Sequence, residues 1–334
     1  MGLKTIFNTI IKCTLIGATV IACTSNQRKS SSDRPNIIFI MADDHATQAI
    51  SCYGSKLNQT PNIDKLASQG ILFRNAFVTN SICAPSRAVI LTGKFSHLNG
   101  VIDNHVRFDS AQMTFPKIFQ KEGYETSIVG KWHLKSEPTG FDYWNVLPGQ
   151  GNYYNPDFIE LGKDTTYHGY VTEITTDIAL NWLSNRETGK PFMLMLHHKA
   201  PHRNWMPNIK SINKYEHTEF PHPVSFYDDY TGREHLKNQK LTVAHHLDIR
   251  YDLKVPCDSC PVDDVNAWVK NYDILTRLDE KQRKGWNSGY EEMISKYFSS
   301  DMSEDELINW NFQRYMQDYL SCILSIDESM GRIM

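Results

Sequence analysis

NIIFIMADD, residues 36–44, is a mostly apolar run that ends in two aspartates. Apolar side chains follow one another from Ile37 to Ala42 without polar alternation, which predicts a strand buried on both faces. Strands of this kind belong to parallel sheets that helices cover on both sides. Asp43 and Asp44 then follow at the carboxyl end of the strand, which is where open α/β sheets bind ligands.

Strand and helix patterns alternate outward from this stretch. Pro61 begins a helix that ends at Gly70, with Thr60 as its cap. The other expected elements are strands at 71–77, 124–129 and 192–197 and helices from 85 to 93, 114 to 123 and 172 to 185. This alternation predicts an α/β fold with a mixed, mainly parallel sheet sandwiched by helices.

The last 130 or so residues fit this alternation less well. Residues 206–300 are rich in Tyr, Asp, Lys and His and show little periodicity, so we interpret them as a long insertion over one end of the sheet. From Ile308 to Met330 the apolar residues return at helical spacing. This helix reaches Met334 with no cap, and we therefore expect the C-terminal part of the fold to be missing.

Composition indicates a globular protein and excludes two classes of function. Of 334 residues, 40% are hydrophobic and 22% are charged, and the formal net charge is -3. There is no basic stripe that would suggest nucleic-acid binding and no acidic tail that would suggest disorder.

The N-terminus predicts export. Residues 1–22 contain an apolar stretch that is too short to span a bilayer and fits a secretory signal. Val20-Ile21-Ala22-Cys23 resembles a bacterial lipobox, which implies a lipid on Cys23, a flexible tether over 23–33 and a lipoprotein of the periplasm or cell envelope. The alternative is an ordinary signal peptide with an incidental cysteine.

Two further cysteines, Cys257 and Cys260, form a lone CxxC. No second pair of Cys or His residues completes a zinc site, and an exported protein favours a local disulfide here. We assign this pair no catalytic role.

Polar and cationic residues follow the predicted strands. Lys131-Trp132-His133 comes after the strand at 124–129, and residues 197–202 (HHKAPH) come after the strand at 192–197. Cys83 precedes a predicted helix N-terminus, which favours an anion. Together with Asp43 and Asp44, these residues suit a metal-assisted attack on a tetrahedral oxyanion ester.

Four segments of this sequence resemble motifs of the sulfatase family, and they occur in the same order as in that family. Cys83-Ala84-Pro85-Ser86-Arg87, followed after four residues by Thr92-Gly93, matches the sulfatase motif C-x-P-S-R-x4-T-G. The other three segments are 35–44, 123–133 and 200–202. The resemblance covers 34–334 and implies an N-terminal catalytic domain of the alkaline-phosphatase-like fold.

The resemblance also implies catalytic roles. Cys83 would be oxidised by a formylglycine-generating enzyme, and the aldehyde hydrate would attack sulfur. Arg87 would hold the hydrate, Lys131 would neutralise sulfate charge, and His133 would help to deprotonate the diol. His202 would protonate the leaving sugar oxygen. His197 and His198 are expected to have supporting or structural roles.

The implied metal is calcium. Asp43, Asp44 and the diol of residue 83 would ligate it, but they supply only part of a shell of six to eight oxygens. Sulfatases carry a second acidic metal pair and a further lysine on later segments, and the sequence as given holds neither. We therefore expect this chain to bind metal weakly and to be nearly inactive.

The flanking residues resemble bacterial N-acetylglucosamine-6-O-sulfatases, which act on heparan-type glycosaminoglycan fragments. Arg203, Asn204 and Trp205 follow His202 and are candidate sugar contacts, although a plain surface loop is an equal reading. A phosphonate or phosphate ester hydrolase of the same superfamily is one alternative. A lipid-anchored glycan-binding remnant without turnover is another.

Overall fold

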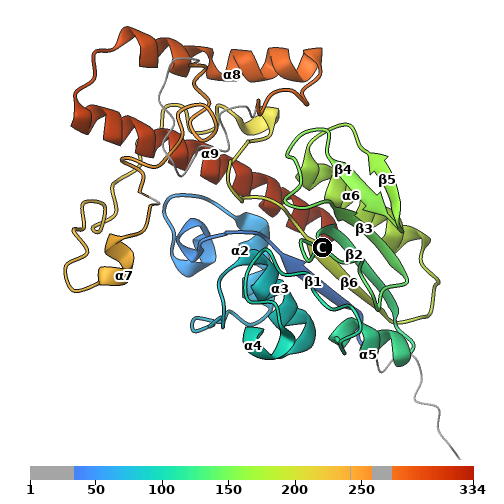
Figure 1. The fold of residues 1–334 in the computed structure, drawn as a ribbon. Helices are drawn as coiled ribbons and strands as arrows, with labels where there is room; N and C mark the ends of the chain where they lie inside the picture. Colours follow the sequence, from blue (N-terminus) through green and yellow to red (C-terminus); the bar gives the residue numbers. More distant parts are fainter. Residues whose placement is uncertain (1–33, 241, 258–272) are drawn as a thin grey trace, which may run out of the picture.

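A computed structural model of the chain describes residues 34–240, 242–257 and 273–334. A six-stranded sheet forms its centre, in the order β1-β6-β2-β3-β4-β5 (Figure 1). The strands are β1 (Ile37–Met41), β2 (Glu125–Lys131), β3 (Tyr143–Leu147), β4 (Asp157–Glu160), β5 (Lys163–Thr166) and β6 (Phe192–His197). The first four strands in this order are parallel, and β4 and β5 are antiparallel.

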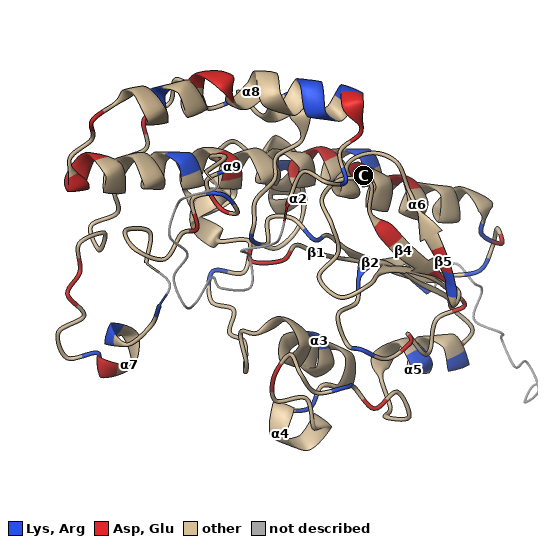
Figure 2. Ribbon diagram, turned by 45° about the horizontal axis from the view of Figure 1, so that its top comes forward, with Lys and Arg blue, Asp and Glu red and all other residues tan. Residues whose placement is uncertain are grey.

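Helices cover both faces of this sheet. The helices in chain order are α2 (Pro61–Gln69), α3 (Cys83–Thr92), α4 (Ser96–Asn99), α5 (Phe115–Lys121), α6 (Val171–Asn185), α7 (Glu234–Lys237), α8 (Glu280–Ser299) and α9 (Glu304–Ile333). Short 3-10 turns occur at Thr47–Ala49, Ser51–Tyr53 and Ile209–Ser211. Figure 2 shows α3 and α5 on one side of the sheet and α6 and α9 on the other. None of the described helices has the length and apolar character that crossing a membrane requires.

The core consists of two apolar layers that β6 separates. Leu194 and Leu196 point to the layer built by α6, α8 and the C-terminal end of α9. Met193 and Met195 point to the opposite layer, against α3 and β3. All four side chains are fully buried, as expected for a strand with helices on both faces. This confirms the prediction for residues 192–197.

Two strand predictions are wrong. Residues 71–77 form no strand, and Ile71, Phe73 and Phe77 are exposed, because this segment pairs with none of the described strands. The strand β1 is real but is not buried on both faces: it lies at an edge of the described sheet, and Ile38 is 39% exposed. An apolar run therefore indicated the strand correctly but not its place in the sheet.

The segment 206–300 contains more regular structure than we predicted. A 20-residue helix, α8, runs alongside α9, and its Trp286 and Tyr290 join the main core (Figures 1 and 2). Two glycines and a mostly polar sequence hide its helical period. Its capping box, in which Asp279 and Gln282 bond each other's backbone, was the available signal.

Candidate active site

Asp43 lies just beyond the carboxyl end of β1 and is 6% exposed. Its backbone N–H donates to the carbonyl of Ala200, 3.1 Å away, which ties this loop to the segment after β6. The carboxylate is in direct contact with the ammonium of Lys131, and Arg87 Nη2 lies 3.5 Å from Oδ2. Burial would raise the pKa of Asp43, but the charges of Lys131, Arg87 and His202 outweigh it and lower the pKa to about 2. Asp43 is therefore an anion held by two buried cations.

Asp44 has a left-handed backbone (φ 62°), which aspartate tolerates better than most residues. Its carbonyl accepts a hydrogen bond from Tyr319 Oη at 2.9 Å, and the same hydroxyl accepts from the N–H of Ala46 at 2.8 Å. Helix α9 thus holds the backbone of this loop. The Asp44 carboxylate is half exposed and lies 3.9 Å from His202 Nε2. Burial and the charge of Asp43 raise its pKa.

Cys83 is the first residue of α3, which therefore begins two residues earlier than the helix predicted from residue 85. Its Sγ lies 3.6 Å from Asp43 Oδ1 and 4.0 Å from Lys131 Nζ. The next backbone N–H, that of Ala84, donates to Asn104 Oδ1 at 2.9 Å, which secures the start of the helix. Burial raises the pKa of the Cys83 thiol, so that the unmodified side chain is kept protonated.

Arg87 lies one helical turn after Cys83 and is 4% exposed. Its Nη1 donates to the carbonyl of Lys131 at 2.5 Å and lies 3.1 Å from His197 Nδ1. The guanidinium therefore joins α3 to the ends of β2 and β6. His197 acts here as a supporting residue, which agrees with the prediction made for it.

Lys131 is the last residue of β2 and is fully buried. His133 follows it with a left-handed backbone (φ 55°) and is partly buried. Burial and the charges of Lys131 and Arg87 lower the pKa of His133 to about 4, so the imidazole is neutral. Its Nδ1 has no hydrogen-bond partner among the described residues, which leaves it free to exchange a proton.

His202 lies beyond the carboxyl end of β6, and its Nδ1 donates to the carbonyl of Arg203 at 2.6 Å. Since a carbonyl can only accept, the proton of the neutral ring is on Nδ1, and Nε2 carries the lone pair. Burial and the charges of Lys131 and Lys199 lower its pKa to about 3. The free nitrogen therefore faces the site as a proton acceptor.

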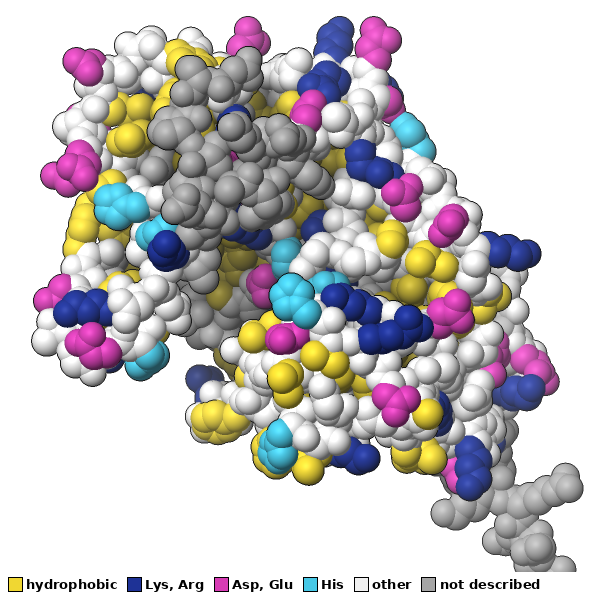
Figure 3. All heavy atoms as spheres, in the orientation of Figure 1, with side chains coloured by type: hydrophobic (Ala, Val, Ile, Leu, Met, Phe, Trp, Pro, Cys, Tyr) yellow, Lys and Arg dark blue, Asp and Glu magenta, His cyan; other side chains and the backbone are white. Residues whose placement is uncertain are grey.

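Three ligand atoms converge at this point. An oxygen of Asp43, the Sγ of Cys83 and a ring nitrogen of His202 all lie within 4.8 Å of one another. The residues come from three segments that are far apart in the sequence: the loop after β1, the start of α3 and the loop after β6. In the space-filling view, histidine, acidic and basic side chains likewise meet near the centre of one face (Figure 3).

The donor set fits a hard divalent cation in part. The carboxylates of Asp43 and Asp44 provide the oxygen ligands that calcium and magnesium prefer. Lys131 and Arg87 occupy Oδ2 of Asp43, and its Oδ1 faces Cys83. The described residues thus offer two carboxylates and the position of residue 83, which is fewer ligands than calcium needs.

A cavity of about 810 Å³ opens beside His202. We call it the His202 cavity; its lining includes His202, Lys199, Arg203, Asn204, Tyr153, Tyr251 and Arg277. The guanidinium of Arg203 forms two hydrogen bonds to Asp252, at 2.7 and 2.5 Å. Arg203 and Asn204 therefore line this cavity, and their contact with a sugar stays a prediction.

Trp205 does not line this cavity. Its ring packs edge-to-face against Tyr315 of α9, with the centroids 4.7 Å apart, and it contacts two apolar clusters. The geometry gives no support to the predicted sugar contact for Trp205, because its indole serves to attach the loop to α9.

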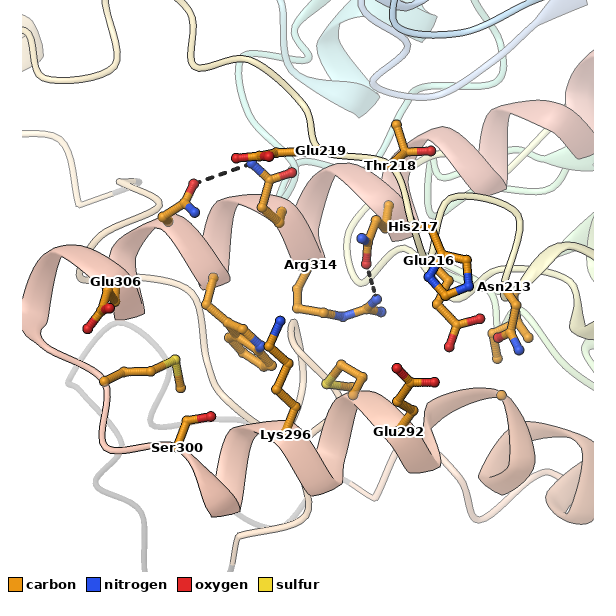
Figure 4. A pocket seen from close by; sticks show the side chains of 18 of the residues that line it. Asn213, Glu216, His217, Thr218, Glu219, Glu292, Lys296, Ser300, Glu306 and Arg314 are labelled. Carbon is orange, nitrogen blue, oxygen red and sulfur yellow. Dashed lines mark hydrogen bonds between the residues drawn. The ribbon is translucent and has the colours of Figure 1, made fainter.

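A second cavity, of about 640 Å³, lies between α8, α9 and residues 212–219. Figure 4 shows charged side chains around it, including Glu216, Glu292, Lys296 and Arg314. We call it the α8–α9 cavity. The lining contains none of the predicted site residues.

With this geometry established, comparison with known proteins identifies the family. The family model described as Sulfatase matches residues 35–334. The chain belongs to the sulfatase family. The predicted fold class is confirmed, since a solved structure covers 90% of this sulfatase chain with a TM-score of 0.84 and 45% sequence identity, and the chain covers 61% of that structure. That structure is described as a complex with its substrate D-glucosamine-2-N,6-O-disulfate.

Two curated relatives carry related names. An N-acetylglucosamine-6-O-sulfatase of Bacteroides thetaiotaomicron is 45% identical over 323 residues, which is 96% of this sulfatase chain and 58% of the relative. The human N-acetylglucosamine-6-sulfatase is 26% identical over 277 residues, 75% of this chain and 47% of the relative. The chain thus spans about half the length of these relatives.

Sequence reasoning missed several residues of the sulfatase site. Asn104 holds the start of α3, and Tyr319 holds the loop of Asp43 and Asp44 from a distance of 275 residues. Nothing in the sequence around either residue indicates these contacts. Lys199 is different: a lysine two residues after a strand of continuous apolar residues was a visible signal, because a buried charge needs a partner or a function.

Proposed function

We propose that this protein hydrolyses the 6-O-sulfate of N-acetylglucosamine in heparan-type glycosaminoglycan fragments. One observation carries the proposal: Asp43, Cys83 and His202 converge within 4.8 Å beside the buried cations Arg87 and Lys131. The 45% identity to a named N-acetylglucosamine-6-O-sulfatase along 96% of the chain supports the choice of sugar and position.

Cys83 is the proposed nucleophile precursor. A formylglycine at this position would be present as an aldehyde hydrate, and one hydroxyl oxygen of the hydrate would attack sulfur. The sulfated hydrate would then collapse to the aldehyde and expel sulfate. Burial raises the pKa of the thiol, and because a protonated thiol is a poor nucleophile, the unmodified cysteine is poorly suited to attack sulfur. A sulfatase-maturating enzyme is therefore a proposed partner.

Arg87 and Lys131 are proposed to stabilise the charge of the reacting sulfate. Both are buried, and fixed positive charges act strongly where water is excluded. Their contacts with Asp43, with the carbonyl of Lys131 and with His197 hold them in place before substrate arrives.

His202 is proposed to deliver a proton to the leaving sugar oxygen from Nε2. The anionic sulfate would raise its pKa from the low value that the neighbouring lysines impose. His133 is proposed to accept a proton when the hydrate collapses, and its neutral ring at physiological pH suits that role.

A divalent cation, proposed to be calcium, would be held by Asp43, Asp44 and the oxygens of residue 83. It would polarise the sulfate oxygens and orient the hydrate.

We also propose a lipid anchor on Cys23 and a location in the cell envelope. Residues 1–33 lie outside the described part of the chain.

The test is sulfate release from N-acetylglucosamine-6-sulfate by the gene product purified from its native host, measured by ion chromatography. The near-inactivity expected above concerns the 334 residues as given. A parallel assay with N-acetylglucosamine-6-phosphate addresses the alternative hydrolase. We expect the sulfate ester to be turned over at least about 100-fold faster, because the relative that is 45% identical is a named sulfatase. Faster turnover of the phosphate, or sugar binding without any turnover, would contradict the proposal.

A further inference from the structure

Lys199 is a buried cation that has no carboxylate partner among the described residues. It lies two residues beyond the end of β6 and is 4% exposed. Its ammonium lies 4.8 Å from the centroid of the Tyr153 ring, and the side chain lines the His202 cavity. In residues 34–240, 242–257 and 273–334, no hydrogen bond or ion pair engages its Nζ.

Two other buried lysines show what this fold does with a structural ammonium. Lys131 contacts the carboxylate of Asp43. Lys254 lies 3.2 Å from Asp318 Oδ2 and donates to the carbonyls of Asn204 and Asp252 at 2.5 and 2.6 Å. Because an unpaired buried charge is costly, the fold neutralises both of these groups, whereas it leaves Lys199 facing a cavity.

The two arginines that line the cavity each form a salt bridge with an aspartate. Arg203 bonds Asp252, and Arg277 lies 2.7 Å from Asp157 Oδ1 and donates to the carbonyl of Asn155. Lys199 is thus the cation of this lining that has no carboxylate within salt-bridge distance among the described residues. Burial, together with the positive charge of Lys131, lowers the pKa of Lys199 to about 7. An anion bound beside both ammonium groups would relieve this repulsion.

We propose that Lys199 is a substrate-binding residue whose ammonium contacts an anionic substituent of the sulfated sugar in the His202 cavity. This inference rests on the function proposed above. The anionic substituent is the sulfate on O6 or a second sulfate on the same sugar. Both are singly charged oxyanions that an ammonium binds in the same way.

The test measures binding in a form that cannot turn over substrate. Cys83→Ala protein is compared with Cys83→Ala/Lys199→Met by titration calorimetry, because methionine keeps the length of the side chain and removes its charge. The probes are N-acetylglucosamine-6-sulfate and D-glucosamine-2-N,6-O-disulfate. Lys296→Met, which changes an exposed lysine on α8, is the matched control in the same background.

We expect Lys199→Met to weaken binding by roughly 10- to 100-fold, since a hydrogen bond to a charged group is lost. We expect its thermal midpoint to stay the same or rise, because an unpaired buried charge is removed. Weakening of both probes assigns Lys199 to the 6-O-sulfate, and weakening of the disulfate alone assigns it to the second sulfate. The control should change affinity less than twofold.

Unchanged affinity of Lys199→Met for both probes, with a lower thermal midpoint, would show a structural lysine and overturn this inference alone. The proposed function would then stand on sulfate release by the wild-type protein. If Cys83→Ala protein binds neither sugar and the wild-type protein releases no sulfate, both the proposed function and this inference fail.

Discussion

The His202 cavity and the α8–α9 cavity have similar volumes, about 810 and 640 Å³, and both have charged linings. They differ in where the charges lie. Around the α8–α9 cavity, Glu292 and Lys296 are exposed side chains of α8 (Figure 4). The buried Arg314 is neutralised by Asp318, which lies 2.7 Å away. Beside the His202 cavity, the buried groups Asp43, Arg87 and Lys131 converge from separate elements. Within the cavity lining, Lys199 has no carboxylate within salt-bridge distance among the described residues.

This difference shows that cavity size is a poor guide to chemistry in this molecule. Exposed charges are screened by water, whereas buried charges that face each other perturb one another's protonation. Perturbed groups in a cleft are the physical mark of a functional site. This difference can be tested with matched substitutions, one among the buried groups near the His202 cavity and one in the α8–α9 cavity.

The largest expected contrast is between Cys83→Ala and Ser300→Ala. Cys83→Ala removes the proposed nucleophile, and we expect turnover of N-acetylglucosamine-6-sulfate to fall by at least about 10³-fold. Ser300 lines the α8–α9 cavity, and its variant should keep turnover within about twofold. Enzyme from the native host should be assayed for sulfate release. A similar loss in both variants would mean that the Cys83 site and the α8–α9 cavity are not functionally distinct.

The next contrast concerns stability. Asp43→Asn leaves the buried Lys131 and Arg87 without their shared carboxylate, and we expect the free energy of unfolding to fall by about 3–5 kcal/mol. Glu292→Gln on exposed α8 should change it by less than about 0.5 kcal/mol. Urea unfolding with a chelator present measures both values. Equal stability of the two variants would show that the Asp43 cluster is not a tightly coupled unit.

The smallest contrast is a pH dependence. Burial lowers the pKa of His198 to about 4, and its Nε2 lies 3.0 Å from Ser329 Oγ. The unfolded chain, with a histidine pKa near 6.5, binds the proton more readily, so His198 lowers stability as the pH falls. Between pH 7 and pH 5 its contribution falls by about 2 kcal/mol.

His198→Asn should therefore lose stability less steeply than the wild-type protein over this pH range, in urea unfolding measured at both pH values. His217→Asn, which changes an exposed residue of the α8–α9 cavity, is the matched control and should follow the wild-type slope. If the slopes of all three proteins coincide, His198 is not held neutral by burial.

The sequence predicted those parts of the fold that depend on local pattern. The continuous apolar run at 192–197 indicated a strand with helices on both faces, and the apolar spacing of 172–185 indicated α6, where Ile174, Ile178 and Trp182 are buried. The strand predicted at residues 71–77 does not form, because an apolar segment becomes a strand only where a neighbouring strand accepts its hydrogen bonds. No local pattern contains that information.

The sequence predicted those residues of the candidate site that belong to recognisable motifs. The residues Asp43, Cys83 and His202 were selected from the sequence, and the structure brings them together. The contacts of Asn104 and Tyr319 depend on the tertiary fold and leave no trace in their neighbouring sequence. Cys257 is disulfide-bonded, while Cys260, its expected partner, lies outside the described residues.

The central claim is that residue 83 acts as formylglycine in a sulfatase site. Mass spectrometry of the peptide that spans residue 83, prepared from the native host, tests it most directly. We expect the peptide to be lighter than the cysteine form by the mass difference between a CH₂SH and a CHO side chain. An intact cysteine thiol at residue 83 in active enzyme from that host would contradict the account.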